Sequence, residues 1–549
     1  MPCDGHAPGR DVAGLQVHMI GIGGSGMSGM GALLLDMGAS VSGSDLVPFQ
    51  GMGQLVAGGA VVTIGHMSDL AMRTVDLVVV SAAIPDTNPE LIAARRAGTC
   101  VVTYAELLGL LMRGRRGMAV AGTHGKSTTT AMCAYICRHA GLDPTFLVGA
   151  RSDQLGGSDG SASSGLGAGP HVIVEACEFN RSFLDLAPMY AAVLNIETDH
   201  VDCFDTFDDI LDAFALFCGR VDRGGLVVCN GDDPNTRRAV AMAAACGSAT
   251  AEHLRHPEDA APVRAARRLS GRVDRLTLTG APARDVAVTA HSTARGPGRG
   301  SALRVLHGSG TGPHIETFGF GDGVDWRAVN LRDDRGRYAF DVTLRGAHLL
   351  TTRLAIPGRH NVANALAAIA LASAAGADPG RIAAALPEFS GVWRRLTFRG
   401  MLGGASVIDD YAHHPTEIRA AIDAVRARYA PKRVLVVFQP HQASRLAAML
   451  DDFADALKAV DAVIVPDVYG ARETGEDALG IQTRGTSPAL VLAIARAGGR
   501  AEYVASFDAI TDRIASTARN DDVVLVMGAG DVWKVTDGLV ERVCESHSA

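Results

Sequence analysis

The sequence of 549 residues lacks the cysteine patterns of a disulfide scaffold or a zinc-binding domain. Its ten cysteines are scattered along the chain, and no two of them form a CxxC pair. Disulfide-rich secreted domains concentrate cysteine in short chains, and zinc sites need clustered ligands. We therefore expect reduced cysteines, most of them buried as small apolar side chains.

Long apolar runs and an excess of positive charge are also missing. No apolar stretch approaches the roughly 20 residues that span a bilayer, and the opening "MPCDGHAPGRDVAG" has no apolar signal core. We therefore predict a cytoplasmic protein without a membrane-inserted segment. The net charge is −8, which gives no support to a nucleic-acid partner.

What the chain does contain is typical of a large α/β enzyme. It is 47% hydrophobic and only 5% aromatic, with 64 glycines. Strand-like apolar runs alternate with helical segments that end at glycine, which predicts α/β units with parallel sheets. We predict three domains, because the length suggests about that number: an N-terminal Rossmann-like domain (1–115), a central P-loop ATPase-like domain (116–390) and a C-terminal Rossmann-like domain (391–549). Stretches near 156–170 and 256–314 are predicted to be insertions in the central domain.

A variant phosphate-binding loop opens the central domain with "AVAGTHGKSTTTAM". Backbone N–H groups of a glycine turn at a helix N-terminus bind phosphate, while Lys126 would neutralise the β- and γ-phosphates and Ser127 would face Mg²⁺. The full pattern has glycine where Val120 stands, so a purely structural turn is the alternative. The residues predicted to bind ATP here are Gly122, Thr123, His124, Gly125, Lys126, Ser127 and Thr128.

A second glycine loop, "MIGIGGSGMSGMG", lies in the N-terminal domain. Gly21, Gly23 and Gly26 form a G-x-G-x-x-G pattern, and Asp45 follows about 20 residues later, as in dinucleotide-binding folds. Taken alone, this loop favours an NAD-dependent oxidoreductase. That interpretation leaves the ATP loop without a task, so a function that uses both loops has to be considered.

Further motifs follow the two loops in order, namely "SAAI…NPEL", "NIETDHVD", "PGRHNVANALAA", "DDYAHHPTEI" and "FQPH". Together with the loops they resemble the Mur ligase family over nearly the whole chain. The resemblance implies an ATP-dependent ligase of peptidoglycan precursor synthesis, with UDP-N-acetylmuramate and L-alanine as substrates. The γ-phosphoryl group would pass from ATP to the lactyl carboxylate, and the amine of L-alanine would attack the resulting acyl phosphate.

The resemblance also implies roles for individual residues. The residues implied in phosphoryl transfer and amide formation are Lys126, Glu175, His200, Arg394, Arg395 and His413. The implied magnesium ligands are Ser127, Glu175 and His200. The residues implied to bind adenine are His360, Asn361 and Asn364. The residues implied to bind the UDP-sugar are Gly23, Gly24, Ser25, Gly26, Asp45 and Ser81. Structural alternatives exist, such as a helix N-cap for Asn361 and a hinge salt bridge for the two arginines.

The chain departs from the family pattern at several positions. The acidic or small polar residues common after Glu175 are replaced by Cys177, Phe179 and Asn180, while Gln442 stands where arginine is common and Trp533 where a small residue is usual. These changes concern the amino-acid pocket. Glycine or serine as acceptor, or a peptide as in a related Mur ligase, therefore stay open alternatives, as does a non-catalytic ATP-dependent sensor. The protein would be a monomer or a homodimer.

Overall fold

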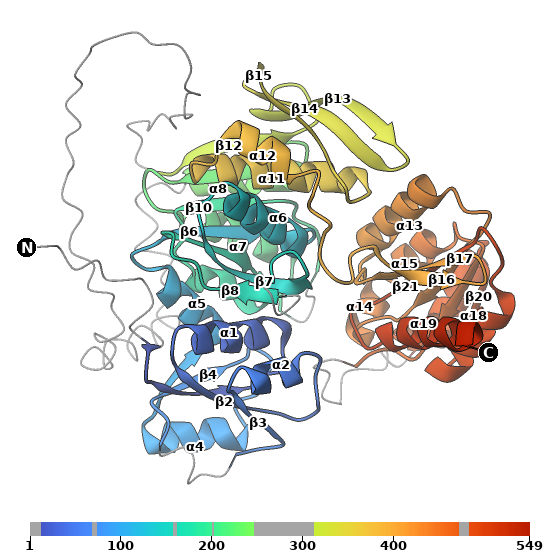
Figure 1. The fold of residues 1–549 in the computed structure, drawn as a ribbon, viewed down its shortest axis with the longest axis horizontal. Coiled ribbons are helices and arrows are strands. Elements are labelled where there is room, and N and C mark those ends of the chain that lie inside the picture. The colour runs from blue at the N-terminus through green and yellow to red at the C-terminus, as the bar shows by residue number, and fades with distance from the viewer. Residues whose placement is uncertain are drawn as a thin grey trace, which may run out of the picture.

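The structure is a computed structural model that describes residues 12–67, 74–156, 162–199, 203–245, 312–470 and 483–548. Its strands form three sheets of five, ten and six strands. We call the parts built on these sheets the N-terminal, central and C-terminal units. In Figure 1 the N-terminal unit lies below the central unit, and the C-terminal unit lies to the right of it.

The N-terminal unit is an all-parallel sheet in the order β3-β2-β1-β4-β5. From β1 the chain adds strands first on one side and then on the other. Ligands of open α/β sheets bind at such a switch point. Its strands are β1 (Gln16–Ile20), β2 (Ser40–Asp45), β3 (Val61–Ile64), β4 (Leu77–Val80) and β5 (Cys100–Thr103). Its helices are α1 (Ser25–Asp36), α2 (Met52–Ala57), α4 (Pro89–Ala97) and α5 (Tyr104–Met112).

The central unit has a sheet in the order β15-β14-β13-β12-β11-β10-β6-β9-β7-β8. Its strands are β6 (Arg116–Ala121), β7 (Thr145–Ser152), β8 (Ala162–Gly165), β9 (His171–Ala176), β10 (Tyr190–Val193), β11 (Leu226–Asn230), β12 (His314–Gly319), β13 (Trp326–Asp334), β14 (Arg337–Leu344) and β15 (Ala347–Arg353). Its helices are α6 (Lys126–His139), the 3-10 helix η2 (Phe179–Asp185), α7 (Phe207–Cys218), α8 (Pro234–Ala245), α11 (Arg359–Ala374) and α12 (Pro379–Ala385).

The edges of this central sheet differ from its parallel middle. Strands β13, β14 and β15 pair antiparallel, and so do β7 and β8. Strand β8 lies within the stretch near 156–170 that the sequence predicts to be an insertion, and nearly all of the stretch 256–314 lies outside the described residues. The predicted domain boundaries stay predictions.

The C-terminal unit has a sheet in the order β16-β17-β21-β18-β19-β20, in which only the β16–β17 pair is antiparallel. Its strands are β16 (Thr397–Leu402), β17 (Ala405–Asp410), β18 (Val434–Phe438), β19 (Ala462–Val465), β20 (Ala501–Tyr503) and β21 (Val523–Met527). Its helices are α13 (Pro415–Tyr429), α14 (Ala443–Ala448), α15 (Leu450–Leu457), α17 (Ser487–Arg496), α18 (Phe507–Thr517) and α19 (Trp533–Ser548).

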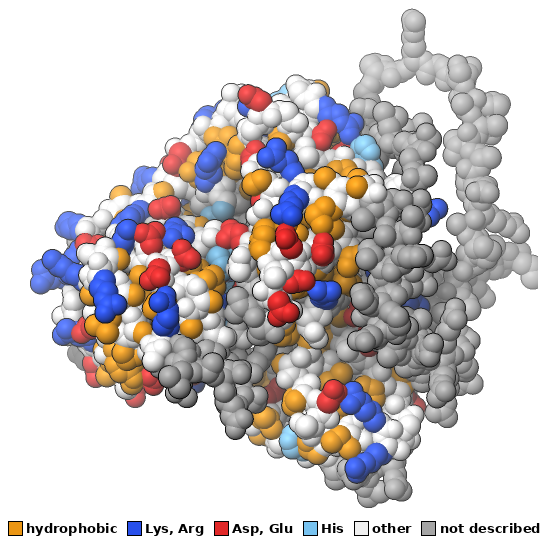
Figure 2. Space-filling view, turned by 180° about the vertical axis from the view of Figure 1, so that it is seen from behind, with side chains coloured by type: hydrophobic (Ala, Val, Ile, Leu, Met, Phe, Trp, Pro, Cys, Tyr) orange, Lys and Arg blue, Asp and Glu red, His pale blue; other side chains and the backbone are white. Residues whose placement is uncertain are grey.

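The cores follow from the residue pattern of the elements. Helix α11 is rich in alanine and leucine and is buried from Val362 through Ala372 apart from Ala363, because it packs against the central sheet and against α6. Charged side chains of both signs are intermingled over the described surface that Figure 2 shows. Among the described residues, no helix has the length and apolar character needed to cross a membrane.

Candidate active site

The phosphate-binding loop joins the end of β6 to the start of α6. Gly122 and Gly125 have φ angles of +139° and +84°, which L side chains rarely adopt. A Cβ on Gly125 would lie 2.6 Å from Oδ1 of Asn364, so the loop packs directly against helix α11. Helix α6 begins at Lys126 with no side-chain cap at its N-terminus. The free N–H groups at such a helix end are suited to phosphate.

Lys126 contacts a carboxylate of its own unit. Its Nζ donates hydrogen bonds to both carboxylate oxygens of Glu178, at 3.0 and 2.9 Å, and to the backbone carbonyl of Thr123 at 3.0 Å. Burial alone would lower the pKa of Lys126, but Glu178 and its neighbours raise it above the usual value. The lysine is therefore a fixed positive charge at the helix N-terminus.

Glu175 lies at the end of β9 beside this loop. Its carboxylate accepts a hydrogen bond from the backbone N–H of Gly149. Burial raises its pKa, and the Gly149 N–H, the Ser127 hydroxyl and Lys126 oppose that shift. A half-buried carboxylate and a hydroxyl oxygen thus lie near each other, as a hard divalent cation requires. His200, the third predicted magnesium ligand, lies outside the described residues.

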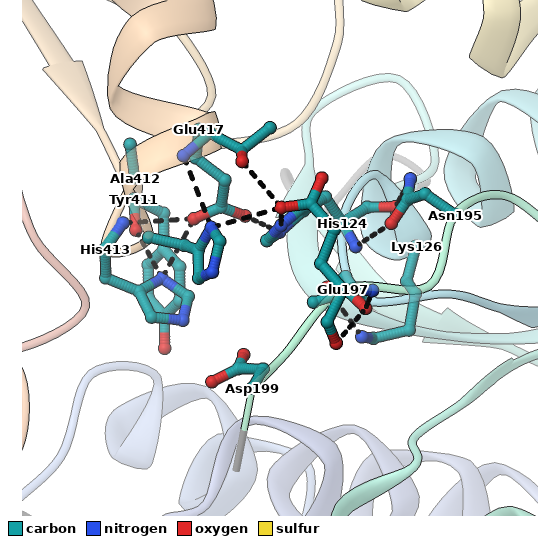
Figure 3. Close-up of polar contacts among 12 residues, drawn as sticks. His124, Lys126, Asn195, Glu197, Asp199, Tyr411, Ala412, His413 and Glu417 are labelled. Atoms are coloured by element: carbon teal, nitrogen blue, oxygen red, sulfur yellow. Dashed lines mark hydrogen bonds and ion pairs between the residues drawn. The ribbon is translucent and has the colours of Figure 1, made fainter. Parts of the chain in front are cut away.

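His124 connects the loop to the C-terminal unit (Figure 3). Its backbone N–H donates to Oδ1 of Asn195 at 2.7 Å, which fixes the main chain. Its Nδ1 lies 3.2 Å from Oε1 of Glu417 on helix α13, and its Nε2 lies 3.6 Å from Oε2 of Glu197. Burial would lower the pKa of His124, but Glu197 and Glu417 raise it to about 9. The imidazolium therefore joins two carboxylates from two units.

Glu417 is the centre of the contacts made by the C-terminal unit. Besides His124 it accepts a hydrogen bond from the backbone N–H of His413 at 3.0 Å and lies 3.5 Å from Nη1 of Arg395. Burial would raise its pKa, but the positive charges of His124 and Arg395 hold it well below the usual value. In contrast, burial lowers the pKa of His413 to about 4, which leaves its imidazole neutral near pH 7.

The two adjacent arginines have different environments. Arg394 has φ +57° and donates to the backbone carbonyls of Gly528 and Gly530 at 2.5 and 3.2 Å, inside the C-terminal unit. Arg395 faces Glu417, whose charge helps to raise the pKa of the guanidinium although burial opposes this. Both arginines line the same cavity, but only Arg395 belongs to the charged network around Glu417.

The predicted adenine residues lie at the start of α11. The side-chain amide of Asn361 donates to the backbone carbonyl of Pro357 at 2.6 Å, and that of Asn364 donates to Oδ1 of Asn361 at 3.1 Å. Gly358, not Asn361, occupies the N-cap of the helix. Asn361 is therefore not a helix cap, and Asn364 lies against the phosphate-binding loop. His360 is exposed beside them.

The glycine loop of the N-terminal unit is held by a single carboxylate. The backbone N–H of Gly23 donates to Oδ2 of Asp45 at 2.8 Å, and a Cβ on Gly23 would lie only 2.6 Å from the ring of Phe49. Helix α1 begins at Ser25, and its N-cap residue Gly24 offers no side chain. Ser81 follows β4 next to Gly21, with its Cβ 3.2 Å from the position that a Cβ on Gly21 would take. This brings the predicted UDP-sugar residues together.

One cavity of about 1070 Å³ joins the three units. Among its lining residues are Gly23, Ser25, Lys126, Ser127, Glu175 and Arg395. The N-terminus of α1 and the N-terminus of α6 therefore open into the same space. Cys177 lines this cavity, and the other four residues that depart from the family pattern do not.

Two carboxylates of this site were not among the predicted residues. Glu197 and Glu417 lie within the motifs "NIETDHVD" and "DDYAHHPTEI", but neither motif shows which partner its glutamate has. Their contacts join residues more than 200 positions apart, such as Thr416 Oγ1, which donates to Oε2 of Glu197 at 2.6 Å. Likewise, Oδ1 of Asp199 lies 2.6 Å from Nη2 of the buried Arg445.

Three family descriptions match successive parts of the chain. The Mur ligase family catalytic domain matches residues 16–116, the Mur ligase middle domain matches 120–268 and 304–372, and the Mur ligase glutamate ligase domain matches 394–530. These ranges correspond to the N-terminal, central and C-terminal units. Most of the chain is therefore covered by descriptions of one family.

Curated relatives and solved structures agree with these matches. The UDP-N-acetylmuramate--L-alanine ligase of Caldanaerobacter subterraneus subsp. tengcongensis is 33% identical over 96% of this chain and 97% of the relative. That of Pelotomaculum thermopropionicum is 36% identical over 97% and 98%. The crystal structure of UDP-N-acetylmuramate-alanine ligase from Thermotoga maritima has a TM-score of 0.71 at 25% identity and covers 97% of this chain and 100% of that chain.

Proposed function

Since this chain belongs to the Mur ligase family, as its motifs predict, we propose that it joins L-alanine to the lactyl carboxylate of UDP-N-acetylmuramate. ATP would be cleaved to ADP and phosphate, and the product would be a precursor of peptidoglycan. The observation that carries the proposal is the single cavity lined by both glycine loops. The names of the curated relatives support the same reaction.

The two loops suit different anions. The uncapped N-terminus of α1 would bind the diphosphate of the UDP-sugar, because its N–H groups have no partner within the helix. The loop before α6 would bind the triphosphate of ATP, and Asn361 and Asn364 would bind adenine. The family assignment favours this use over the NAD-dependent oxidoreductase that the first loop suggests when taken alone.

The chemistry requires a carboxylate to approach a phosphate although both are negative. Lys126 and Arg395 would provide the positive charge for the transferring γ-phosphoryl group. Lys126 is now paired with Glu178, so it would exchange this carboxylate for phosphate oxygens when ATP binds. Arg394, which also lines the cavity, would orient the loop that carries Arg395.

The residues around Ser127 fit a magnesium ion. The Ser127 hydroxyl and the half-buried Glu175 carboxylate provide oxygen ligands next to the predicted triphosphate site. We propose that both residues hold Mg²⁺, which would neutralise charge on the phosphate oxygens when bound. The role of His200 as a further ligand stays a prediction.

Amide formation requires L-alanine as a free amine. The Nδ1 of His413 lies 3.0 Å from the backbone carbonyl of Tyr411 and 3.2 Å from Glu417, which assigns the ring proton to Nδ1. The neutral ring then offers Nε2 as an acceptor at the cavity wall. We propose that His413 orients the incoming ammonium group, and that the amine attacks the acyl phosphate after losing its proton to water, with phosphate as the leaving group.

The decisive experiment measures phosphate release by the purified protein with ATP, Mg²⁺ and UDP-N-acetylmuramate. L-alanine, glycine and L-serine are added in separate reactions, and the amide product is identified by mass. We expect phosphate release to require both the sugar nucleotide and L-alanine. ATP turnover that is indifferent to the sugar, or sugar-dependent binding without an amide product, would refute the proposal and favour the sensor alternative.

A further inference from the structure

A second cluster of metal-ligating side chains lies where the central and C-terminal units meet. It consists of His124, Glu197 and His414, one ligand atom of each lying within 4.8 Å of the others. Oε2 of Glu197 lies 3.6 Å from Nε2 of His124 and 3.7 Å from Nδ1 of His414. Figure 3 shows the side chains of His124 and Glu197 beside each other.

These separations are close to those of a bound transition metal. Zn²⁺ bonds to nitrogen and oxygen ligands measure roughly 2.0–2.2 Å, so tetrahedral geometry places neighbouring ligand atoms about 3.4 Å apart. A shift of a few tenths of an ångström brings Oε2 of Glu197 to that spacing from each imidazole nitrogen, and the two nitrogens lie within 4.8 Å of each other. Two imidazoles and one carboxylate, with a fourth position open, form a ligand set typical of zinc rather than magnesium.

The other nitrogen of each imidazole has the partner that a metal ligand needs. Nδ1 of His124 lies 3.2 Å from the carboxylate of Glu417, and Nε2 of His414 lies 3.3 Å from the backbone carbonyl of Thr198. Acceptors on the outer nitrogen hold one ring proton there, and the ion would displace the second proton of the His124 imidazolium from its inner Nε2. The inner Nε2 of His124 is buried and has no hydrogen bond within ordinary distance in the described structure.

Two contacts of Thr416 would adjust when an ion binds. Its backbone N–H lies 3.3 Å from Nδ1 of His414, a long contact that the ion would replace. Its hydroxyl donates to Oε2 of Glu197 at 2.6 Å, and that oxygen keeps a second lone pair for a metal. The side chains of His124 and His414 are 13% and 6% exposed and that of Glu197 is 34% exposed, so the two imidazoles are shielded and the site opens to water at the carboxylate.

We propose that His124, Glu197 and His414 form a binding site for a zinc-class divalent ion, separate from the predicted magnesium site at Ser127 and Glu175. His124 and Glu197 belong to the central unit and His414 to the C-terminal unit. An ion bound there connects the phosphate-binding loop to the C-terminal unit. Such a connection restrains the two units in the arrangement of this structure.

The test uses the full chain, stripped of metal, in a buffer with excess Mg²⁺ and no nucleotide. Co²⁺ is titrated first and followed by its visible absorption bands, and Zn²⁺ binding is then measured by calorimetry. We expect one equivalent of Co²⁺ to give the strong bands of a low-coordinate site, and Zn²⁺ to displace it. The excess Mg²⁺ occupies oxygen-only sites and does not compete for imidazole ligands.

Variants locate the ion. His414→Asn removes the imidazole but keeps a side-chain acceptor for the N–H of Thr416. Glu197→Gln removes the carboxylate. Each variant is expected to weaken Zn²⁺ binding at least about 100-fold and to abolish the cobalt bands. Glu417→Gln keeps all three proposed ligands and changes the outer acceptor of His124, and we expect about 10- to 100-fold weaker binding with the bands retained.

A matched control is His139→Asn. His139 also lies beside a glutamate, at 3.3 Å from Glu388, but on the exposed side of the central unit. Its replacement is expected to leave metal binding unchanged. Circular dichroism confirms that each variant is folded, and Glu197→Gln carries the test if His414→Asn is not. The proposal is overturned if the unaltered chain gives no cobalt bands, or if folded ligand variants bind Zn²⁺ as tightly as the control. Neither result bears on the proposed ligase reaction, because no substrate is present.

Discussion

The two glycine loops of this protein both precede a helix without a side-chain cap, but their charged surroundings differ. In the first loop, Gly23 is held by one carboxylate, that of Asp45, and the helix N-terminus opens without charged side chains in the contacts that the structure describes. In the second loop, Lys126 and His124 contact Glu178, Glu197 and Glu417. We infer that the first loop serves binding and the second serves chemistry.

The largest effect is expected from Lys126→Ala. Loss of the charge at the second loop should reduce sugar- and alanine-dependent phosphate release by about 10³-fold or more, because it removes stabilisation of the transferring phosphoryl group. The rate is measured with a coupled phosphate assay at saturating substrates. Lys432→Ala is the control, since Lys432 is 70% exposed and pairs with Asp521 at the surface. A Lys126→Ala rate within tenfold of the unaltered chain would contradict the assignment.

A matched pair of glycine substitutions separates the two loops. Gly125→Ala places a Cβ 2.6 Å from Asn364, and Gly23→Ala places one 2.6 Å from Phe49. We expect Gly125→Ala to raise the KM for ATP by about tenfold or more, because it strains the loop backbone. Gly23→Ala should raise the KM for the UDP-sugar by a similar factor.

Gly125→Ala should leave the KM for the UDP-sugar nearly unchanged, and Gly23→Ala should leave the KM for ATP nearly unchanged. Gly53→Ala serves as the control, since a Cβ there meets nothing within 4 Å. If either loop variant raised both KM values equally, the loops would not bind separate ligands.

A smaller effect is expected from Glu90→Gln behind the first loop. The fully buried Glu90 accepts a hydrogen bond from Ser44 at 2.5 Å, directly before Asp45. Burial would raise its pKa, but His18, Ser44 and Met67 hold it below the usual value. Glu90→Gln should cost about 2 kcal/mol of unfolding free energy at pH 7 and raise the KM for the UDP-sugar more than it lowers kcat.

The pH dependence of that variant provides a second check. Because the pKa of Glu90 is depressed in the folded state, the stability that its carboxylate provides is fully present above the unfolded-state pKa near 4.5. This stability is lost as the pH falls through the folded-state pKa. The melting temperature of the unaltered chain should therefore fall more steeply below about pH 4.5 than that of Glu90→Gln. Parallel curves would show that folding does not depress the pKa of Glu90.

The smallest effect is expected from Cys177→Ser. Cys177 lines the shared cavity, but its exposed thiol makes no contact on which the proposed steps depend. We expect kcat/KM for L-alanine to change by less than about threefold, and the preference over glycine and serine to persist. A changed preference would place the acceptor amino acid beside Cys177.

The sequence predicts those parts of the fold that depend on local patterns. The α/β class is confirmed, since the glycine loops and apolar strands stand where their spacing places them. The antiparallel extension of β13, β14 and β15 was not predicted, because alternation along short strands does not reveal which edge they join.

The site was predictable to a different extent. The phosphate-binding loop and the position of Glu175 at the end of β9 follow from local patterns. The pairing of His124 with Glu417 depends on how two units dock, and no local pattern contains that information. Similarly, the adjacent Arg394 and Arg395 are equivalent in sequence but not in space, because the positive φ of Arg394 turns consecutive side chains in different directions. The assigned roles themselves stay predictions.

The contact between Lys126 and Glu178 has a consequence for how the enzyme discriminates among anions. The lysine already has a counter-ion, so an incoming phosphate group must replace a carboxylate that makes two hydrogen bonds at 2.9–3.0 Å. A small anion such as inorganic phosphate gains little from that exchange. A nucleotide triphosphate can offset the loss of the Glu178 contact with contacts along its whole length. The loop therefore favours the nucleotide over inorganic phosphate, which the reaction releases.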